Sequence, residues 1–191
     1  ISEGYTAEVG YVPRKNYFKM EGDFGHLFFT KGEMNLLSHG PRIVRTYFFD
    51  TDFKKKDNIN RIGYQLNFKN RSRFSFGMNN QYITLLLDFD PIRTQQANLS
   101  AGTTHRWKSW KISYESKPQN RFTYSIEALT GGYYENGKRS AFLGEFSYRF
   151  QPYFDINSII NYNYIELREP WNRNPFWLLG LKANLTLTNT L

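Results

Sequence analysis

The sequence predicts an all-β fold, an antiparallel transmembrane β-barrel of which this chain supplies an incomplete segment of about ten strands. Three observations lead to this prediction. Aromatic residues make up 18% of a chain whose mean hydropathy is only −0.63. Apolar and polar residues alternate from about residue 40 onward, and short connections alternate with longer ones. Strands that cross a membrane in a barrel place apolar side chains outward and polar side chains in the lumen.

Seven successive segments alternate in this way and are predicted to be strands. In the first of them, Ile62 and Tyr64 share one face, whereas Gly63 and Gln65 share the other. The seven segments are residues 61–69, 73–81, 110–116, 121–128, 141–150, 154–164 and 179–188. Weaker patterns predict strands at about 3–12, 22–30 and 42–51, and about residues 1–20 are interpreted as a lead-in strand or plug segment. Composition does not shift along the chain, so residues 1–191 are interpreted as a single barrel domain or part of one.

Three short connections are predicted to be three-residue turns, at 70–72, 117–119 and 151–153. Such turns keep the residues on either side on the same face of the sheet. The residues that they bring opposite one another are Phe68 and Phe74, Tyr114 and Phe122, and Phe150 and Phe154. Other connections are predicted at about 52–57, 87–104 and 166–174, together with a further three-residue turn at 135–137. Tight periplasmic turns and longer outer loops alternate in this way in outer-membrane barrels.

The formal net charge of +8 suits an anionic partner, but the basic residues are scattered along the chain. The one basic run, Lys54 to Lys56, precedes Asp57 and Asn58 and is interpreted as a solvated loop. Cysteine is absent, which excludes disulfides and thiolate metal sites. No segment of the sequence approaches the roughly 20 apolar residues of a transmembrane helix.

Charged residues on the polar faces are predicted to form a network in the lumen of the barrel. The three-residue turn at 135–137 would place Glu127 opposite Glu145, about 5 Å away. Two carboxylates at that spacing also suit a cation site or a retaining glycosidase, and both alternatives stay open beside the charge network. The same reasoning about register pairs Arg149 with Asp155 and Glu115 with Arg121. The predicted network comprises Lys111, Glu115, Arg121, Glu127, Glu145, Arg149, Asp155 and Lys182.

The four tryptophans, Trp107, Trp110, Trp171 and Trp177, all fall near the predicted long connections. Tyrosine and phenylalanine cluster near the short turns. Aromatic girdles at the two interfaces of a membrane have this distribution, so the tryptophans are predicted to belong to such a girdle. The alternative is a soluble β-sandwich in which the same rings fill a core.

Five segments, taken in order, resemble one family of proteins. They are Val9–Tyr17, Ser38–Pro41, Asn70–Gly77, Tyr148–Pro152 and Trp177–Gly180. The family they resemble consists of outer-membrane proteins from Bacteroidota-type Gram-negative bacteria, in which a module similar to family-9 carbohydrate-binding modules precedes a β-barrel domain of unknown function. The resemblance covers essentially the whole chain and implies an outer-membrane barrel. The sugar-binding module lies outside it, so no sugar-binding residue is transferred to this chain. Complete bacterial barrels have an even number of strands, and this chain is expected to be a segment of a longer protein.

The leading hypothesis is an outer-membrane barrel that serves as a pore, anchor or scaffold and contacts lipid and other outer-membrane proteins. The resemblance further implies a link to glycan handling or to a larger outer-membrane complex. The connection at 87–104 is the expected place for a partner or ligand contact. The alternative is a soluble basic β-domain that binds a polyanion or nucleic acid through interleaved aromatic and basic residues. Under the leading hypothesis, the protein is not expected to bind nucleic acid.

The sequence predicts no catalytic constellation, no metal site and no cofactor. His26, His39 and His105 lie in different segments and lack the spacing of metal ligands. We find no nucleophile elbow, phosphate loop or dinucleotide fingerprint in the sequence. An enzyme of the membrane-barrel type, such as a lipase or protease, is a third hypothesis. It would need a serine or aspartate partner for His105, which the sequence does not identify.

Overall fold

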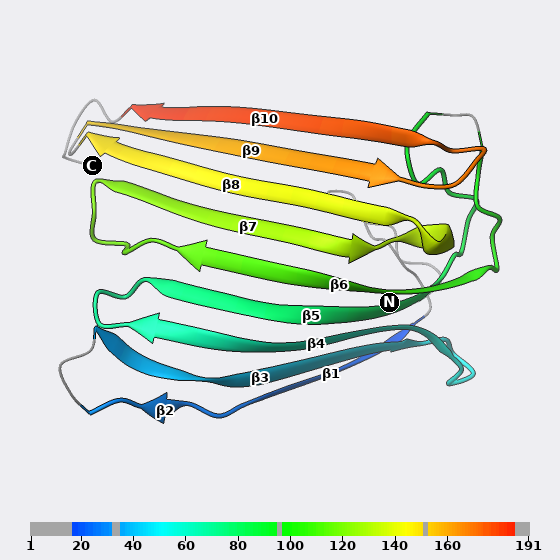
Figure 1. Ribbon diagram of the computed structural model, residues 1–191, viewed down its shortest axis with the longest axis horizontal. Coiled ribbons are helices and arrows are strands. Elements are labelled where there is room, and N and C mark those ends of the chain that lie inside the picture. Colours follow the sequence, from blue (N-terminus) through cyan, green and yellow to red (C-terminus); the bar gives the residue numbers. More distant parts are fainter. Residues whose placement is uncertain (1–16, 32–34, 95–96, 151–152, 186–191) are drawn as a thin grey trace.

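The computed structural model describes residues 17–31, 35–94, 97–150 and 153–185. These residues form one antiparallel sheet of ten strands, which confirms the all-β prediction (Figure 1). The described part of the chain holds no helix with the length and apolar character needed to span a membrane. The strand predicted at about 3–12 and most of the lead-in segment lie outside the described residues.

The strands follow one another across the sheet as a meander, in the order β1-β3-β4-β5-β6-β7-β8-β9-β10. Their bounds are β1 (Phe18–Gly25), β3 (Leu36–Phe49), β4 (Lys55–Phe68), β5 (Arg73–Thr84), β6 (Thr104–Glu115), β7 (Phe122–Gly132), β8 (Lys138–Phe150), β9 (Phe154–Glu166) and β10 (Arg173–Leu185). The short β2 (Phe28–Phe29) pairs with β3 next to β1, and the 3-10 turn η1 (Tyr134–Asn136) follows β7. Each predicted segment from residue 22 onward overlaps one of these elements.

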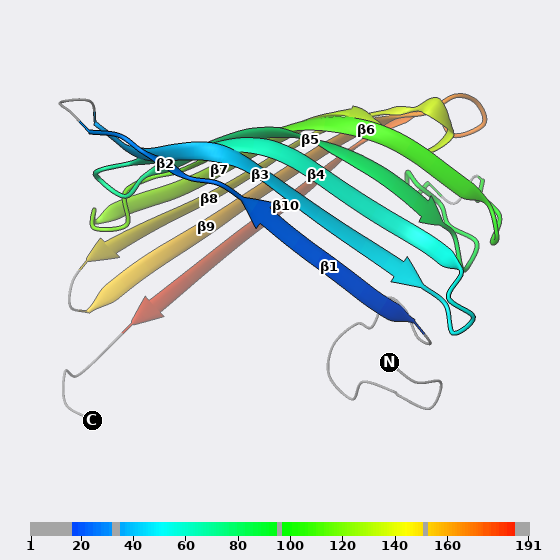
Figure 2. The same cartoon turned by 90° about the horizontal axis from the view of Figure 1, so that it is seen from below.

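The sheet curves into an open arch (Figure 2). Its edges are β1 with β2 on one side and β10 on the other, and the described residues contain no pairing between β1 and β10. The connections β4–β5, β6–β7 and β8–β9 lie at one end of the arch, which we call the short-turn end (Figure 1). The connections β3–β4, β5–β6, β7–β8 and β9–β10 lie at the other end, which we call the long-loop end.

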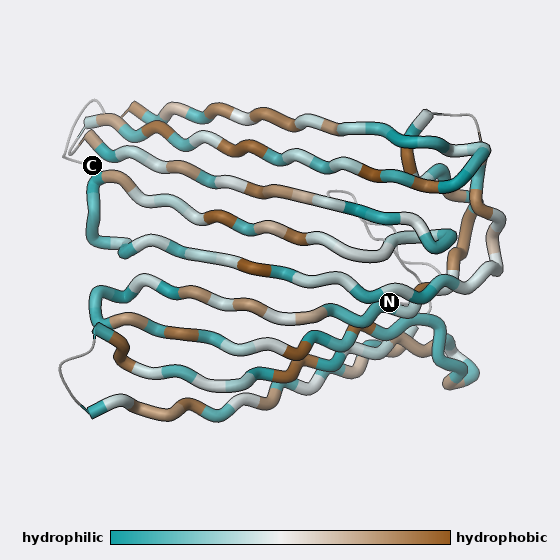
Figure 3. Tube along the Cα trace, viewed as in Figure 1, coloured by the Kyte–Doolittle hydropathy of each residue, from teal (hydrophilic) through white to brown (hydrophobic). Residues whose placement is uncertain are grey.

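The predicted alternation of faces is present on every long strand. Directly paired residues point to the same face, so the register traces rows across the sheet. One row consists of Phe76, Ile112, Ala128, Phe142 and Tyr162, and the adjacent row on the opposite face consists of Ser75, Ser113, Glu127, Leu143 and Asn161. Figure 3 shows the resulting alternation of hydrophobic and hydrophilic positions along the strands. The polar face lines the inside of the arch, and the apolar face is its convex outside.

Burial on this sheet is the reverse of that in a soluble sandwich. The buried polar residues of the strands lie on the concave face: Ser38, Thr46, Asp57, Asn79, His105 and Ser109. The exposed large apolar residues lie mostly on the convex face, among them Met20, Phe76, Trp110, Ile112, Trp177, Leu179, Leu181 and Leu185. Ile159 and Leu178 are exceptions, because they are exposed on the concave face near the open β10 edge.

Two of the three pairings predicted across short turns are wrong, and the third is confirmed. Tyr114 lies opposite Ile126 rather than Phe122, because the β6–β7 connection runs from 116 to 121. Phe74 lies opposite Leu66 rather than Phe68, since five residues (68–72) separate the last paired residues, Asn67 and Arg73, instead of the three predicted. Phe150 does lie opposite Phe154, with ring centroids 5.7 Å apart.

The β3–β4 turn accounts for part of the basic run. Asp50 accepts hydrogen bonds from the backbone N of Lys54 at 2.8 Å and of Asp52 at 3.0 Å, and Lys56 Nζ lies 3.2 Å from its carboxylate. The hydrogen bond from Lys54 and the charge of Lys56 hold the pKa of Asp50 below its ordinary value. Lys54 is exposed in the turn, as predicted for a solvated loop, whereas Lys55 and Lys56 begin β4.

Candidate functional site

The concave face holds a hollow of about 410 Å³ between β1 and β6. Its lining combines four basic residues with three acidic ones and several small polar side chains. The charged lining residues are Glu21, Asp23, Arg42, Arg61, Arg73, Lys111 and Glu115. Strand alternation brings these side chains to the same face, because each occupies a concave position of its strand.

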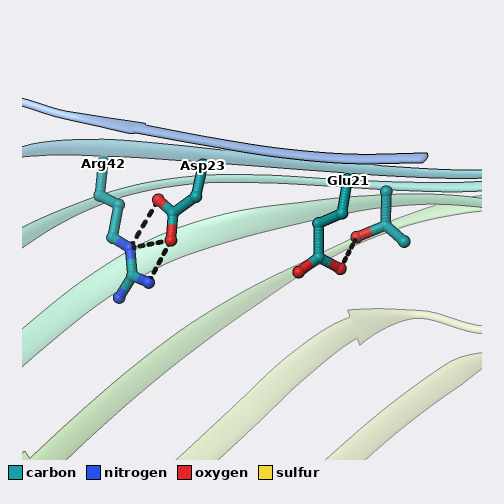
Figure 4. Close-up of polar contacts among 4 residues, drawn as sticks. Glu21, Asp23 and Arg42 are labelled. Atoms are coloured by element: carbon teal, nitrogen blue, oxygen red, sulfur yellow. Dashed lines mark hydrogen bonds and ion pairs between the residues drawn. The ribbon is translucent and has the colours of Figure 1, made fainter.

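A charged pair near the β1 edge is the best-defined contact of this hollow. Arg42 donates from Nε to Asp23 Oδ1 at 3.0 Å and from a terminal nitrogen to Asp23 Oδ2 at 2.5 Å (Figure 4). Glu21, two residues before Asp23 on the same face, accepts a hydrogen bond from Thr46 Oγ1 at 2.9 Å. This cluster was not predicted from the sequence, in which the alternating Glu21 and Asp23 in a weak strand pattern are the available signal.

The predicted charge network is brought together only in part. Lys111 Nζ lies 2.6 Å from Glu127, and Glu115 lies 3.6 Å from Arg73, which had not been included in the prediction. The pairing of Glu115 with Arg121 is wrong, since Glu115 lies opposite Ser125 and Arg121 lies in the β6–β7 connection.

The predicted opposition of Glu127 and Glu145 is also wrong. Glu127 lies opposite Leu143, and Glu145 lies opposite Ser125. The reason is the β7–β8 connection, in which Gly132 pairs with Lys138 and residues 133–137 form the turn instead of 135–137 alone. The carboxylate pair on which the cation-site and glycosidase alternatives depended is therefore not formed.

The predicted network residues on β8, β9 and β10 lie beside a row of hydrogen-bonded asparagine side chains on β9 (Asn157, Asn161 and Asn163), which we call the amide ladder. Arg149 does lie opposite Asp155, but Asp155 Oδ2 accepts hydrogen bonds from Asn157 at 2.7 Å and from Asn184 at 2.8 Å. Lys182 lies opposite Asn157. Ser147 donates to Asn157 Oδ1 at 2.6 Å. Small hydroxyls and amides in such a ladder satisfy one another and leave polar atoms for water.

The described residues of the β5–β6 loop, 85–94 and 97–103, fold over the concave face at the long-loop end, and we call them the cap. Its Ile92 is 0% exposed and packs against Ile165 and Leu167. The indole of Trp171 donates to the Ala97 carbonyl at 2.8 Å, and Asn174 Nδ2 donates to the Ile92 carbonyl at 2.9 Å. The cap is thus fixed to the β9–β10 side of the arch, across the opening from the strands that carry it.

A second apolar cluster fixes the base of the cap. It comprises Leu85, Leu99, Trp107 and Tyr134, all of them buried. The cap and the ends of the strands below it contain the buried apolar residues of the described chain, so the apolar core of this protein lies at one end of the arch rather than between two sheets.

His105 has partners that the sequence did not identify. Its Nε2 lies 2.9 Å from Thr103 Oγ1, and its Nδ1 lies 3.2 Å from Glu135. The Thr103 hydroxyl donates to the Ser100 carbonyl at 2.7 Å, so its proton is not directed at His105. The ring therefore links the cap to η1, and this arrangement differs from an activated nucleophile in which the hydroxyl donates to the histidine.

The four tryptophans divide between two environments. Trp110 and Trp177 are exposed on the convex face, at 60% and 65%. Trp107 is buried beneath the cap, and the indole N–H of Trp171 donates a hydrogen bond to the cap at Ala97. The predicted aromatic girdle therefore rests on Trp110 and Trp177 alone.

The concave face, with its paired charges, amide ladder and cap, is the candidate functional site. No group of three or more histidines, aspartates or glutamates suited to a metal ion occurs among the residues that the structure describes. The face can hold water and polar solutes, since its side chains are small or mutually paired. Comparisons of the chain with protein-family models, with curated proteins and with solved structures found no match.

Proposed function

We propose that this chain is part of an outer-membrane β-barrel, that its concave face lines a water-filled lumen, and that its cap narrows the mouth of that lumen. One observation supports the proposal above all others: the strands bury polar residues on the concave face and expose large apolar residues on the convex face. In water, a continuous apolar face of this size would be covered or would aggregate. In a bilayer the acyl chains of the lipids contact the same face and shield it from water.

The lengths of the apolar segments fit a bilayer. On the convex face of β8, β9 and β10, apolar or glycine positions fill residues 142–150, 154–164 and 175–185, apart from Ser158. These segments are nine, eleven and eleven residues long. A tilted transmembrane strand needs about 9–11 residues to cross the hydrocarbon core. The strands are antiparallel, with short turns at one end and a folded loop at the other, which is also typical of outer-membrane barrels.

The cap favours a pore over a simple anchor. A loop that folds into the barrel and bonds to the opposite strands narrows the passage, while the hollow of about 410 Å³ on β1 to β6 is not lined by any cap residue. The paired charges beside the hollow would give the passage a preference for small polar solutes. A link to glycan handling or to a larger outer-membrane complex is carried only by the family resemblance and is proposed on that ground.

The first experiment is fractionation followed by gel analysis. The proposal expects the protein in the outer-membrane fraction, extractable only by detergent, with unheated and boiled samples that migrate differently because the closed sheet resists unfolding. A protein that stays monodisperse in buffer without detergent contradicts the membrane proposal.

One observation favours the polyanion alternative. The Tyr82 ring on the convex face has Lys55 Nζ at 4.9 Å and the Arg106 guanidinium at 5.6 Å from its centroid. Aromatic rings flanked by cations also bind the bases and phosphates of nucleic acids. Salt-sensitive binding of an oligonucleotide by detergent-free protein would support this alternative, because release of counterions makes such binding fall steeply with salt.

A further inference from the structure

A second hollow, of about 490 Å³, lies on the other side of the sheet, at the long-loop end. The side chains that line it from convex positions are Arg106, Lys108, Thr130, Lys138 and Ser140, all of them exposed. Its lining contains no aspartate or glutamate. The hollow therefore concentrates positive charge and hydroxyl groups on the convex face, in a row that continues through Asn80 and Asn60 to Arg45.

The residue between two of the cations, Gly132, carries no side chain, and a Cβ there would meet strand β6 itself. Gly132 lies between Lys108 on β6 and Lys138 on β8, and it pairs directly with Lys138. A Cβ at Gly132 would lie 3.0 Å from Trp107 Cβ and 3.3 Å from the Lys108 carbonyl oxygen. The two lysines stand two strands apart, about 10 Å at the backbone, with no side chain between them. Flexible lysine side chains at this spacing can both reach one anion.

The hollow borders the apolar band directly. Thr130 pairs with Trp110 and with Ser140, and the Thr130 and Ser140 hydroxyls lie 3.2 Å apart at the lower side of the hollow. The next row toward the short-turn end is apolar, with Ile112, Ala128 and Phe142. An exposed tryptophan beside cations and hydroxyls at the end of an apolar band is the arrangement of a membrane interface.

We propose that this hollow binds the phosphate group of an anionic lipid headgroup, with Lys108 and Lys138 on either side and Arg106 above. The inference rests on the proposed function, because it requires the convex face to contact lipid. Continuity with the apolar band selects a lipid over a free anion: a bound headgroup keeps its acyl chains against Trp110 and Ile112. Glu166 lies opposite Lys138 on the side away from the hollow and limits the positive charge in that direction.

The test is native mass spectrometry of the detergent-purified protein titrated with diphosphoryl lipid A, with monophosphoryl lipid A and with phosphatidylcholine. We expect tightest retention of the diphosphoryl lipid, and a loss of about 10- to 30-fold in that affinity in the double variant K108Q/K138Q, given the usual contribution of a lysine at an anionic surface. The matched control is K69Q/K117Q, which removes the same charge from exposed positions at the short-turn end. The control should retain the lipid.

Three outcomes overturn the inference. Equal losses in both double variants would show that net charge alone attracts the lipid. Equal retention of phosphatidylcholine would show that the hollow has no preference for the anionic headgroup. Displacement of the lipid by inorganic phosphate at an equal concentration would assign the hollow to free phosphate. A heat-dependent gel shift measured on each sample separates these outcomes from failure of the barrel proposal, since that shift reports the membrane fold itself.

Discussion

Trp107 and Trp110 lie three residues apart on β6 and point to opposite sides of the sheet. Trp107 is 8% exposed beneath the cap, and Trp110 is 60% exposed on the convex face. The same residue type thus serves as core on the concave side and as free apolar surface on the convex side. This division extends along the strands and underlies the membrane proposal.

A charge on the convex face is expected to destabilise the protein in a bilayer. Ile112, exposed on that face, lies in the apolar row between Phe76 and Ala128. Ile112→Arg should cost less than the roughly 2–4 kcal/mol of an arginine at the bilayer midplane, because its row adjoins the interfacial Trp110, and urea titration of protein folded into lipid vesicles measures that cost. The control is Ser125→Arg on the concave face, where Glu115 and Glu145 lie directly opposite and can pair with the new charge. Equal costs for the two variants would contradict the assignment of faces.

The cap should open when its anchor is removed. Ile92→Ala deletes a fully buried side chain and should weaken the closed position of the cap by about 2–4 kcal/mol. Trypsin cleavage after the neighbouring Arg93 should then be faster, and it can be followed by gel analysis of folded protein. Leu87→Ala is the matched control on the same loop, because Leu87 is 78% exposed and its loss leaves no cavity. Unchanged cleavage in Ile92→Ala would mean that the cap is held by other contacts.

The Arg42–Asp23 pair should set the ion preference of the lumen. Asp23→Asn leaves the cation of Arg42 without its partner and should shift selectivity toward anions, whereas Arg42→Gln should shift it toward cations. Reversal potentials in planar bilayers under a salt gradient measure both shifts. The effect on stability should be small, because both side chains are about half exposed and water screens the pair. Shifts of the same sign in the two variants would place the pair outside the conduction path.

The β3–β4 turn should contribute a pH-dependent stabilisation. The pKa of Asp50 is lowered by the hydrogen bond from Lys54 N and by Lys56, so its contribution is complete above the ordinary aspartate value and is lost as the pH falls through the lowered one. Asp50→Ala should therefore be less stable than the parent protein at neutral pH, and the difference should narrow in acid. Asp50→Asn keeps the acceptor oxygen without the charge, so its loss relative to the parent should be smaller at neutral pH and should also narrow in acid, where the parent carboxylate becomes protonated. Urea titrations at the two pH values measure the difference.

The alternation in the sequence was enough to predict where the long strands lie and which side chains share a face. A period of two identifies which residues share a face even when the partner strand is misplaced. The register errors at Glu127 and at Tyr114 were shifts of two and four positions, which are even and therefore leave each side chain on its predicted face. Only turn length separates such registers, and the turns at 116–121 and 133–137 lack a sequence signature that fixes their length.

The cap could not have been predicted in the same way. Its residues have no period, and its anchors join Ala97 to Trp171 and Ile92 to Asn174, which are 74 and 82 positions apart. Contacts at such separation depend on how far the sheet curves, a property that local patterns do not encode. For the same reason, Trp107 and Trp171 were assigned to a girdle that only Trp110 and Trp177 can join.

A single-cysteine scan along β8 tests the membrane proposal most directly, and the chain suits it because it contains no cysteine. Cysteines at positions 142–148 would be introduced one at a time in protein folded into vesicles and exposed to a water-soluble maleimide. If the convex face contacts lipid, cysteines in place of Leu143, Glu145 and Ser147 should react through the wet lumen, while cysteines in place of Phe142, Phe146 and Tyr148 should be protected by lipid. Reaction at all positions, or protection of the first set and reaction of the second, would contradict the membrane proposal.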